Sequence, residues 1–75
     1  VAIGPNPATN QVTVFNNWDN NELRNIEIRN LNGQLLQRVP FAGKQQSIEL
    51  SLPTGLYIMN MEFERGTGSK KFMVN

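Results

Sequence analysis

Carboxylates are the side chains of this chain that could do acid–base chemistry, because its 75 residues include no histidine and no cysteine. That composition removes the usual general base, the nucleophilic thiol and most transition-metal ligands. Glu62 and Glu64 lie two positions apart, so in a strand they would share one face and could form a carboxylate pair. Glycosidases hold such a pair about 5–9.5 Å apart across a cleft, for which a domain this small has no room. We therefore interpret both glutamates as a solvated strand face.

Three further segments contain the residue types of a binding site. The polar run at 19–22 could offer oxygens to calcium, but calcium loops carry more carboxylates, which favours a solvated turn. Trp18 could stack on a sugar ring or fold over the end of the core, and a domain short of apolar mass favours the core. The glycine-rich run at 66–69 lacks the spaced lysine and the following helix of a phosphate loop. We predict that it is a hairpin turn.

The charge of the chain is nearly balanced, with seven basic residues, six acidic residues and a net charge of +1. Nucleic-acid binding would need a far more basic face. Only Lys70 and Lys71 form a local cluster, and a basic pair of this kind usually protects the edge of a sheet. A chain this short buries only about 60% of its unfolded surface, so its core is marginal. We predict neither a nucleic-acid partner nor a small-molecule substrate.

Alternation of apolar and polar residues with a period of two predicts an all-β chain. The predicted strands cover residues 11–16, 23–29, 47–52, 57–63 and 70–74, and a further strand ends at Pro40. The residues predicted to face the core include Val12, Val14, Ile26, Ile28, Phe41, Ile48, Leu50, Leu52, Tyr57, Met59, Met61 and Phe63. Six to seven short strands joined by turns, with no helical period, predict an antiparallel β-sandwich.

The segment Leu-Pro-Thr-Gly-Leu-Tyr at 52–57 predicts a corner between two strands. Proline restricts φ and removes a donor, and glycine permits a positive φ, so Pro53 and Gly55 can turn the chain. Tyr57 can then lie over the turn and hydrogen-bond to the upstream backbone. That arrangement is the tyrosine corner of immunoglobulin-like sandwiches, so the predicted fold class is an immunoglobulin-like antiparallel β-sandwich.

Asn32 and Gly33 predict a β-hairpin that follows the strand at 23–29, in one of two registers. A two-residue loop would place Leu35, Gln37 and Val39 beside Ile26 and Ile28, whereas a three-residue loop with Gly33 in a bulge would bring Leu36 onto the Ile28 face. A slip of one residue moves every side chain to the opposite face of the sheet. The two registers therefore predict different cores.

Four short motifs follow one another along the chain. They are Pro5-Asn6-Pro7-Ala8, Asn32-Gly33, Leu52-Pro53-x-Gly55-x-Tyr57 and Lys70-Lys71-Phe72-x-Val74. In this order and spacing they resemble the C-terminal sorting domain of proteins exported by type IX secretion in Bacteroidetes-type bacteria. The resemblance covers nearly the whole chain. In that family an apolar residue follows the turn glycine by three positions, which favours the three-residue loop with Leu36 facing inward.

The resemblance implies that residues 1–75 are a single C-terminal sorting domain excised from a longer secreted protein. An extended segment would cover residues 1–9 and the sandwich residues 10–75. The domain would be a non-catalytic secretion signal without a cofactor, although its cargo could be an enzyme. Its partners would be the outer-membrane translocon and a sortase-like peptidase that removes it. The cargo would cross the periplasm and reach the cell surface or the extracellular space.

The resemblance also assigns recognition or turn roles to particular residues, none of them catalytic or metal-binding. These are Pro5, Asn6, Pro7, Gly33, Pro53, Gly55, Tyr57, Lys70, Lys71, Phe72 and Val74. The last strand, if it lies at an edge, could accept a partner by strand addition, or pair two copies into a homodimer. The alternative interpretation is an accessory carbohydrate-binding or fibronectin-like spacer domain of a secreted enzyme, with Trp18 as the candidate sugar-binding residue.

Overall fold

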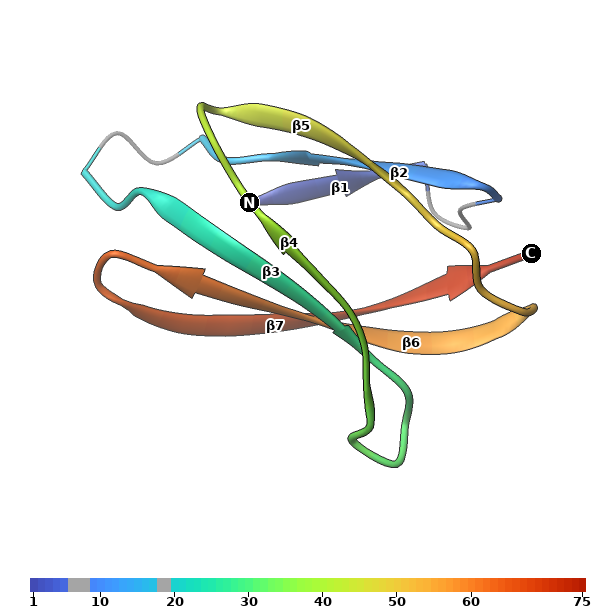
Figure 1. Cartoon of the computed structure of the whole chain (residues 1–75). Helices are drawn as coiled ribbons and strands as arrows, with labels where there is room; N and C mark the ends of the chain where they lie inside the picture. Colours follow the sequence, from blue (N-terminus) through green and yellow to red (C-terminus); the bar gives the residue numbers. More distant parts are fainter. Residues whose placement is uncertain (6–8, 18–19) are drawn as a thin grey trace.

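The structure, a computed structural model, describes residues 1–5, 9–17 and 20–75. Its strands are β1 (Ala2–Gly4), β2 (Gln11–Phe15), β3 (Leu23–Arg29), β4 (Leu35–Pro40), β5 (Gln45–Glu49), β6 (Gly55–Phe63) and β7 (Gly66–Val74). They form a three-stranded sheet, β1-β2-β5, and a four-stranded sheet, β4-β3-β6-β7, both antiparallel. Figure 1 shows the two sheets as facing layers. The predicted all-β sandwich is confirmed, and the described residues hold no helix that could cross a membrane.

The core lies between the two sheets and is built mainly from alternate residues of their strands. Its buried members are Val12, Val14, Leu23, Ile26, Ile28, Phe41, Ile48, Leu50, Tyr57, Met59, Met61, Phe63, Phe72 and Val74. β3 has the predicted bounds, and the predicted inward face of β6 is confirmed along its whole length. Each large apolar side chain buried here contributes about 1.5–3 kcal/mol through the hydrophobic effect.

The first residues of the chain form the short edge strand β1 of the smaller sheet. Ala2–Gly4 pairs antiparallel with the stretch of β2 from Thr13 to Phe15. Val1 and Ile3 also pack against the core. The N-terminal part of the extended segment is therefore tied to the sandwich by backbone pairing.

The hairpin between β3 and β4 has the predicted three-residue loop. Gly33 N donates to Asn30 O at 3.0 Å, and Asn30 N donates to Gln34 O at 3.1 Å. Gly33 has a φ of +86°, in the left-handed region that glycine adopts without the steric cost of a side chain. These bonds close a turn of residues 31–33 with the glycine in a bulge, so this part of the hairpin prediction is confirmed.

A second bulge, at Leu36, shifts the register of the same hairpin by one residue. Arg29 pairs with Leu35, but Ile28 pairs with Gln37, which leaves Leu36 as the extra residue. The prediction that Leu36 faces the core is wrong, because 37% of its surface is exposed. β4 is an edge strand that pairs on one side only, so it can accommodate an extra residue without breaking a second ladder.

The turn between β6 and β7 comes earlier in the chain than predicted. Residues 64–65 make the turn, and the next residue already pairs with Phe63. The prediction that residues 66–69 are the hairpin turn is wrong, because they form the start of β7. Asn21 holds the turn from outside: its Oδ1 accepts a hydrogen bond from Arg65 N at 2.9 Å. A residue distant in the sequence thus contacts the turn directly.

β5 is also displaced from its predicted bounds, since it covers Gln45–Glu49 instead of 47–52. Beyond the strand, Leu50 N donates to Asn10 O at 2.8 Å, and Leu50 is buried as predicted. Leu52 is only partly buried. Phe41 lies just past β4 and caps the core as expected, with its N–H donating to Arg24 O at 2.8 Å.

Candidate functional site

The predicted tyrosine corner is present where the chain crosses from β5 to β6. The Tyr57 hydroxyl donates a hydrogen bond to the Pro53 carbonyl oxygen at 2.6 Å, and Tyr57 is buried. Gly55 begins β6 with a φ of +159°, close to extended backbone, so the corner does not depend on a left-handed glycine. A Cβ at Gly55 would lie 3.8 Å from the Tyr57 ring. The corner therefore fastens the crossover to the larger sheet through the tyrosine.

Replacing Tyr57 by phenylalanine should lower the free energy of unfolding by about 1 kcal/mol, the usual net contribution of one hydrogen bond. The ring would keep its packing, so the loss would report the hydroxyl bond alone. Urea unfolding of Tyr57→Phe and of the parent domain measures the difference. An unchanged midpoint would show that the corner bond does not contribute to stability.

The predicted terminal motif divides into buried anchors and exposed charges along β7. Phe72 and Val74 have only 2% and 1% of their surface exposed. Phe72 pairs with Tyr57 across the strands, with ring centroids 6.1 Å apart, so the terminal motif adjoins the corner. Lys70 and Lys71 are exposed, and β7 is an edge of the four-stranded sheet. The motif both completes the core and presents charge at an edge.

The other predicted motif residues lie away from this pair of motifs or outside the described residues. Gly33 is in the β3–β4 hairpin, where its carbonyl oxygen accepts a hydrogen bond from Arg29 Nη1 at 2.7 Å. Pro5 is exposed just after β1. Asn6, Pro7 and Trp18 lie outside the described residues. The structure therefore brings the corner and the terminal motif together on β6 and β7 and places the turn glycine in the hairpin on the other side of β6.

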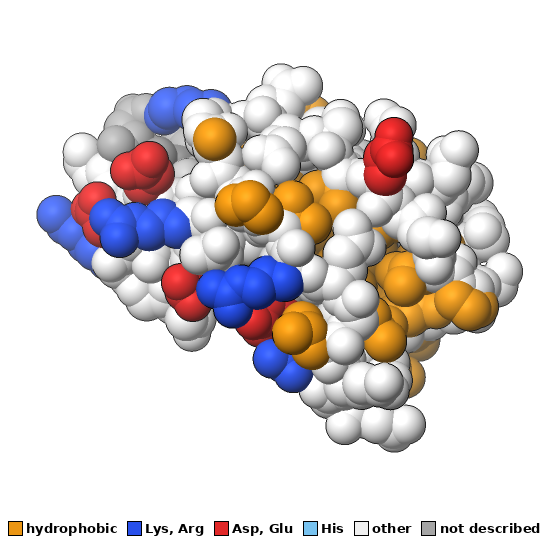
Figure 2. Space-filling model, in the orientation of Figure 1, with side chains coloured by type: hydrophobic (Ala, Val, Ile, Leu, Met, Phe, Trp, Pro, Cys, Tyr) orange, Lys and Arg blue, Asp and Glu red, His pale blue; other side chains and the backbone are white. Residues whose placement is uncertain are grey.

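Glu27 of β3 and Glu64 of the β6–β7 turn form ion pairs with arginines. Glu27 accepts from Arg29 at 3.0 Å and from Arg38 at 3.1 Å, and Glu64 pairs with Arg24 at 3.4 Å. Figure 2 shows acidic and basic side chains gathered over one part of the visible face, with hydrophobic side chains over another. Exposed pairs of this kind contribute about 0–1 kcal/mol each. They are surface ion pairs and do not form a reactive carboxylate pair.

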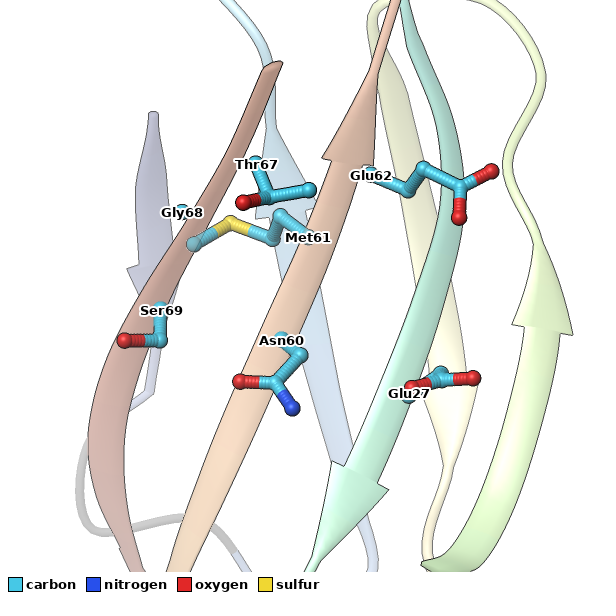
Figure 3. A pocket seen from close by; sticks show the side chains of 7 residues that line it. All are labelled: Glu27, Asn60, Met61, Glu62, Thr67, Gly68 and Ser69. Carbon is cyan, nitrogen blue, oxygen red and sulfur yellow. The ribbon is translucent and has the colours of Figure 1, made fainter.

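Glu62, the partner that Glu64 would need for acid–base chemistry, lies in a shallow depression of about 430 Å³. The depression is lined by Glu27, Asn60, Met61, Glu62, Thr67, Gly68 and Ser69. Figure 3 shows that these residues come from the neighbouring strands β3, β6 and β7. The Glu62 carboxylate accepts a hydrogen bond from Asn25 Nδ2 at 3.3 Å, and both Glu62 and Glu64 are exposed. The interpretation of the two glutamates as solvated fits this arrangement.

The depression also differs from an ordinary ligand pocket. Small-molecule pockets are mostly apolar clefts with a few convergent polar groups, whereas carboxylates, an amide and hydroxyls line this open depression together with Met61 and Gly68. Within residues 1–5, 9–17 and 20–75, no group of three or more acidic side chains converges on a metal site. The features that remain as candidates for a functional surface are the corner, the terminal motif and the sheet edge on which that motif lies.

The comparison with known families decides what these features belong to. Residues 2–75 match the family described as "Secretion system C-terminal sorting domain". The chain belongs to this family. No curated protein and no solved structure matches the sorting domain significantly. The resemblance seen in the four motifs is therefore confirmed over essentially the whole chain.

Membership of the family establishes the general role of the sorting domain. It is a C-terminal signal for type IX secretion, a system of Bacteroidetes, and the family is non-catalytic. The signal implies interaction with the type IX system and export to the cell surface or the extracellular space.

The first half of β7 is the part of the sorting domain that the sequence interpretation missed. Residues 66–69 are Gly-Thr-Gly-Ser, so they show no alternation of apolar and polar side chains. Glycine is rare in strands and common in turns, which suggested a hairpin. Gly68 is in van der Waals range of the interior, since a Cβ there would lie 3.6 Å from the Phe63 ring.

Proposed function

We propose that the sorting domain is a folded export address that a sortase-like peptidase removes from its cargo by cutting on the N-terminal side of β1. The family match over residues 2–75 carries this proposal. The cargo would cross the periplasm with the domain attached and reach the outer-membrane translocon. Cleavage at the surface would then release the cargo from its address.

The pairing of β1 supports a cut upstream of the sandwich. Proteases bind extended, accessible backbone, and exposed segments outside the fold are cut most readily. Ala2–Gly4 is already paired with β2, so a cut inside β1 would first require this pairing to open. A cut before Ala2 would leave the whole sandwich intact on the released fragment.

The test is to fuse residues 1–75 to the C-terminus of a periplasm-directed fluorescent protein in a type IX-competent host and in its secretion mutant. We expect the reporter at the surface or in the medium of the competent host, without the domain, and no export in the mutant. Mass spectrometry of the mature reporter would locate the cut. Uncleaved reporter in the periplasm of both strains would contradict the proposal.

A further inference from the structure

β7 is the long, regular edge of the sandwich. It pairs with β6 from Phe63 opposite Gly66 to Gly55 opposite Val74 without a register shift. The other edge strands are blunted: β1 and β5 are short, and β4 contains a bulge and ends at Pro40. Short length, bulges and prolines are the devices that protect a sheet edge from pairing. Among the described strands, β7 lacks all three.

The hydrogen-bond alternation shows which residues of β7 face outward. Phe41 N donates to Arg24 O, so even-numbered residues of β3 bond to β4 and odd-numbered residues bond to β6. The even-numbered residues of β6 therefore bond to β3, and its odd-numbered residues bond to β7. The even-numbered residues of β7 are then the ones that bond to β6. The N–H and C=O groups of Thr67, Ser69 and Lys71 then point away from the sheet. No hydrogen bond to these groups is present within the described part of the chain.

A positive charge flanks this open row on each side of the sheet. Lys70 pairs with the buried Met59, so it lies on the side of the core, and Lys71 pairs with Ile58 on the outer side. Both lysines are exposed. The salt bridges among the described residues are all made by arginines. Two lysine charges are therefore available to a strand that adds to β7.

The same charges oppose pairing between two copies of the domain. An antiparallel pair that used all of β7 from both copies would place Lys70 of one copy opposite Lys70 of the other. Like charges directly opposite each other destabilise strand pairing, and lysine on an edge discourages self-association. A strand with carboxylates opposite Lys70 and Lys71 would be attracted by the lysine charges, whereas a second copy of β7 would be repelled by them.

We propose that β7 receives an extended acidic segment of a partner protein by strand addition during export. The inference rests on the proposed function, because it names the surface through which the folded address is recognised. The segment would hydrogen-bond to the backbone of Thr67, Ser69 and Lys71. Two consecutive acidic residues would point to opposite sides of the extended sheet, one toward Lys70 and one toward Lys71.

Proline at an outward-facing edge position tests the backbone part of this proposal. Proline removes the N–H donor, and an edge position tolerates it because that N–H makes no bond within the sheet. Ser69→Pro would therefore block strand addition while leaving the fold intact. Ser47→Pro is the corresponding control on β5: Leu50 N to Asn10 O and Asn16 N to Lys44 O direct the Ser47 N–H away from the sheet, and the substitution also removes the 3.0 Å bond between the Ser47 and Thr13 hydroxyls.

In the reporter assay we expect Ser69→Pro to fold, as judged by its urea midpoint, but to remain in the periplasm, while Ser47→Pro is exported like the parent. Export of a folded Ser69→Pro protein at the parent level would overturn the proposal. If Ser69→Pro does not fold, the double variant K70E/K71E decides, with about tenfold less reporter expected at the surface. Parent-level export of that variant would equally overturn it.

A direct binding measurement separates this proposal from the export function. The probe is a capped peptide of alternating valine and threonine around two central glutamates, with a control peptide that carries lysines instead. We expect the acidic peptide to slow hydrogen exchange at the amides of Ser69 and Lys71, and the lysine peptide to have no effect. Equal effects of both peptides, or none from the acidic one, would overturn the proposal of an acidic partner strand even if the domain directs export. Protection by the acidic peptide alone would support it even if the reporter is not exported.

Discussion

Deleting residues 70–75 should abolish export of the attached cargo. The deletion removes Phe72 and Val74, which are almost completely buried, and it removes the charged half of the β7 edge. Without these residues, the inner face of β6 loses its neighbour across from Tyr57. The folded address and its candidate recognition edge would be lost together. Fractionation of cells that carry the truncated reporter fusion measures the effect, and full surface delivery of the truncated cargo would refute the prediction.

A matched variant separates folding from recognition in this experiment. The double substitution K70Q/K71Q keeps Phe72 and Val74, so its urea midpoint should match that of the parent domain. Exposed substitutions away from structural features usually change stability by about 0.5 kcal/mol or less. Reduced export of this folded variant would assign part of the truncation effect to the charges.

Replacing Phe72 by alanine should produce the largest loss of stability from a single substitution in β7. Truncation of a buried phenylalanine typically costs about 3–5 kcal/mol, because it loses transfer free energy and leaves a cavity. A chain of this size has a total stability of about 4–11 kcal/mol, at roughly 0.05–0.15 kcal/mol per residue. Phe72→Ala would thus remove much of the free energy of unfolding of the domain. Urea unfolding followed by circular dichroism measures the change.

The adjacent residue supplies the control for this substitution. Met73 lies on the opposite face of β7, with 42% of its surface exposed. Met73→Ala should change the free energy of unfolding by about 0.5 kcal/mol or less. Equal losses from Phe72→Ala and Met73→Ala would mean that β7 is not packed with Phe72 inward.

Local patterns in the sequence predicted most of the core and the tyrosine corner. The alternation in β3 and β6 identifies the buried residues directly, because side chains of a strand point to opposite faces in turn. The Pro53-to-Tyr57 bond could be predicted because both partners lie within one short segment. The loop at Gly33 could be predicted for the same reason, since its hydrogen bonds join residues 30–34.

The wrong predictions for Leu36 and for residues 66–69 both concern pairing between strands. Leu36 is exposed because a bulge on an edge strand shifts its register, and the alternation of β4 contains no mark of that shift. Residues 66–69 belong to β7 because they pair with β6, and Asn21, distant in the sequence, hydrogen-bonds to the turn at 64–65. Glycine composition alone could not distinguish a turn from a strand that packs closely against Phe63.

By itself, then, the sequence determined the all-β class, the inward faces of most strands, the corner and the family. These depend on side-chain period and on contacts between near neighbours in the chain. Only the tertiary structure decided that β7 lies at an edge, that Thr67, Ser69 and Lys71 face outward, and that the terminal motif adjoins Tyr57. Strand order and the direction of unpaired backbone groups depend on which distant segments pair, and such pairing leaves no trace in the local alternation of one strand.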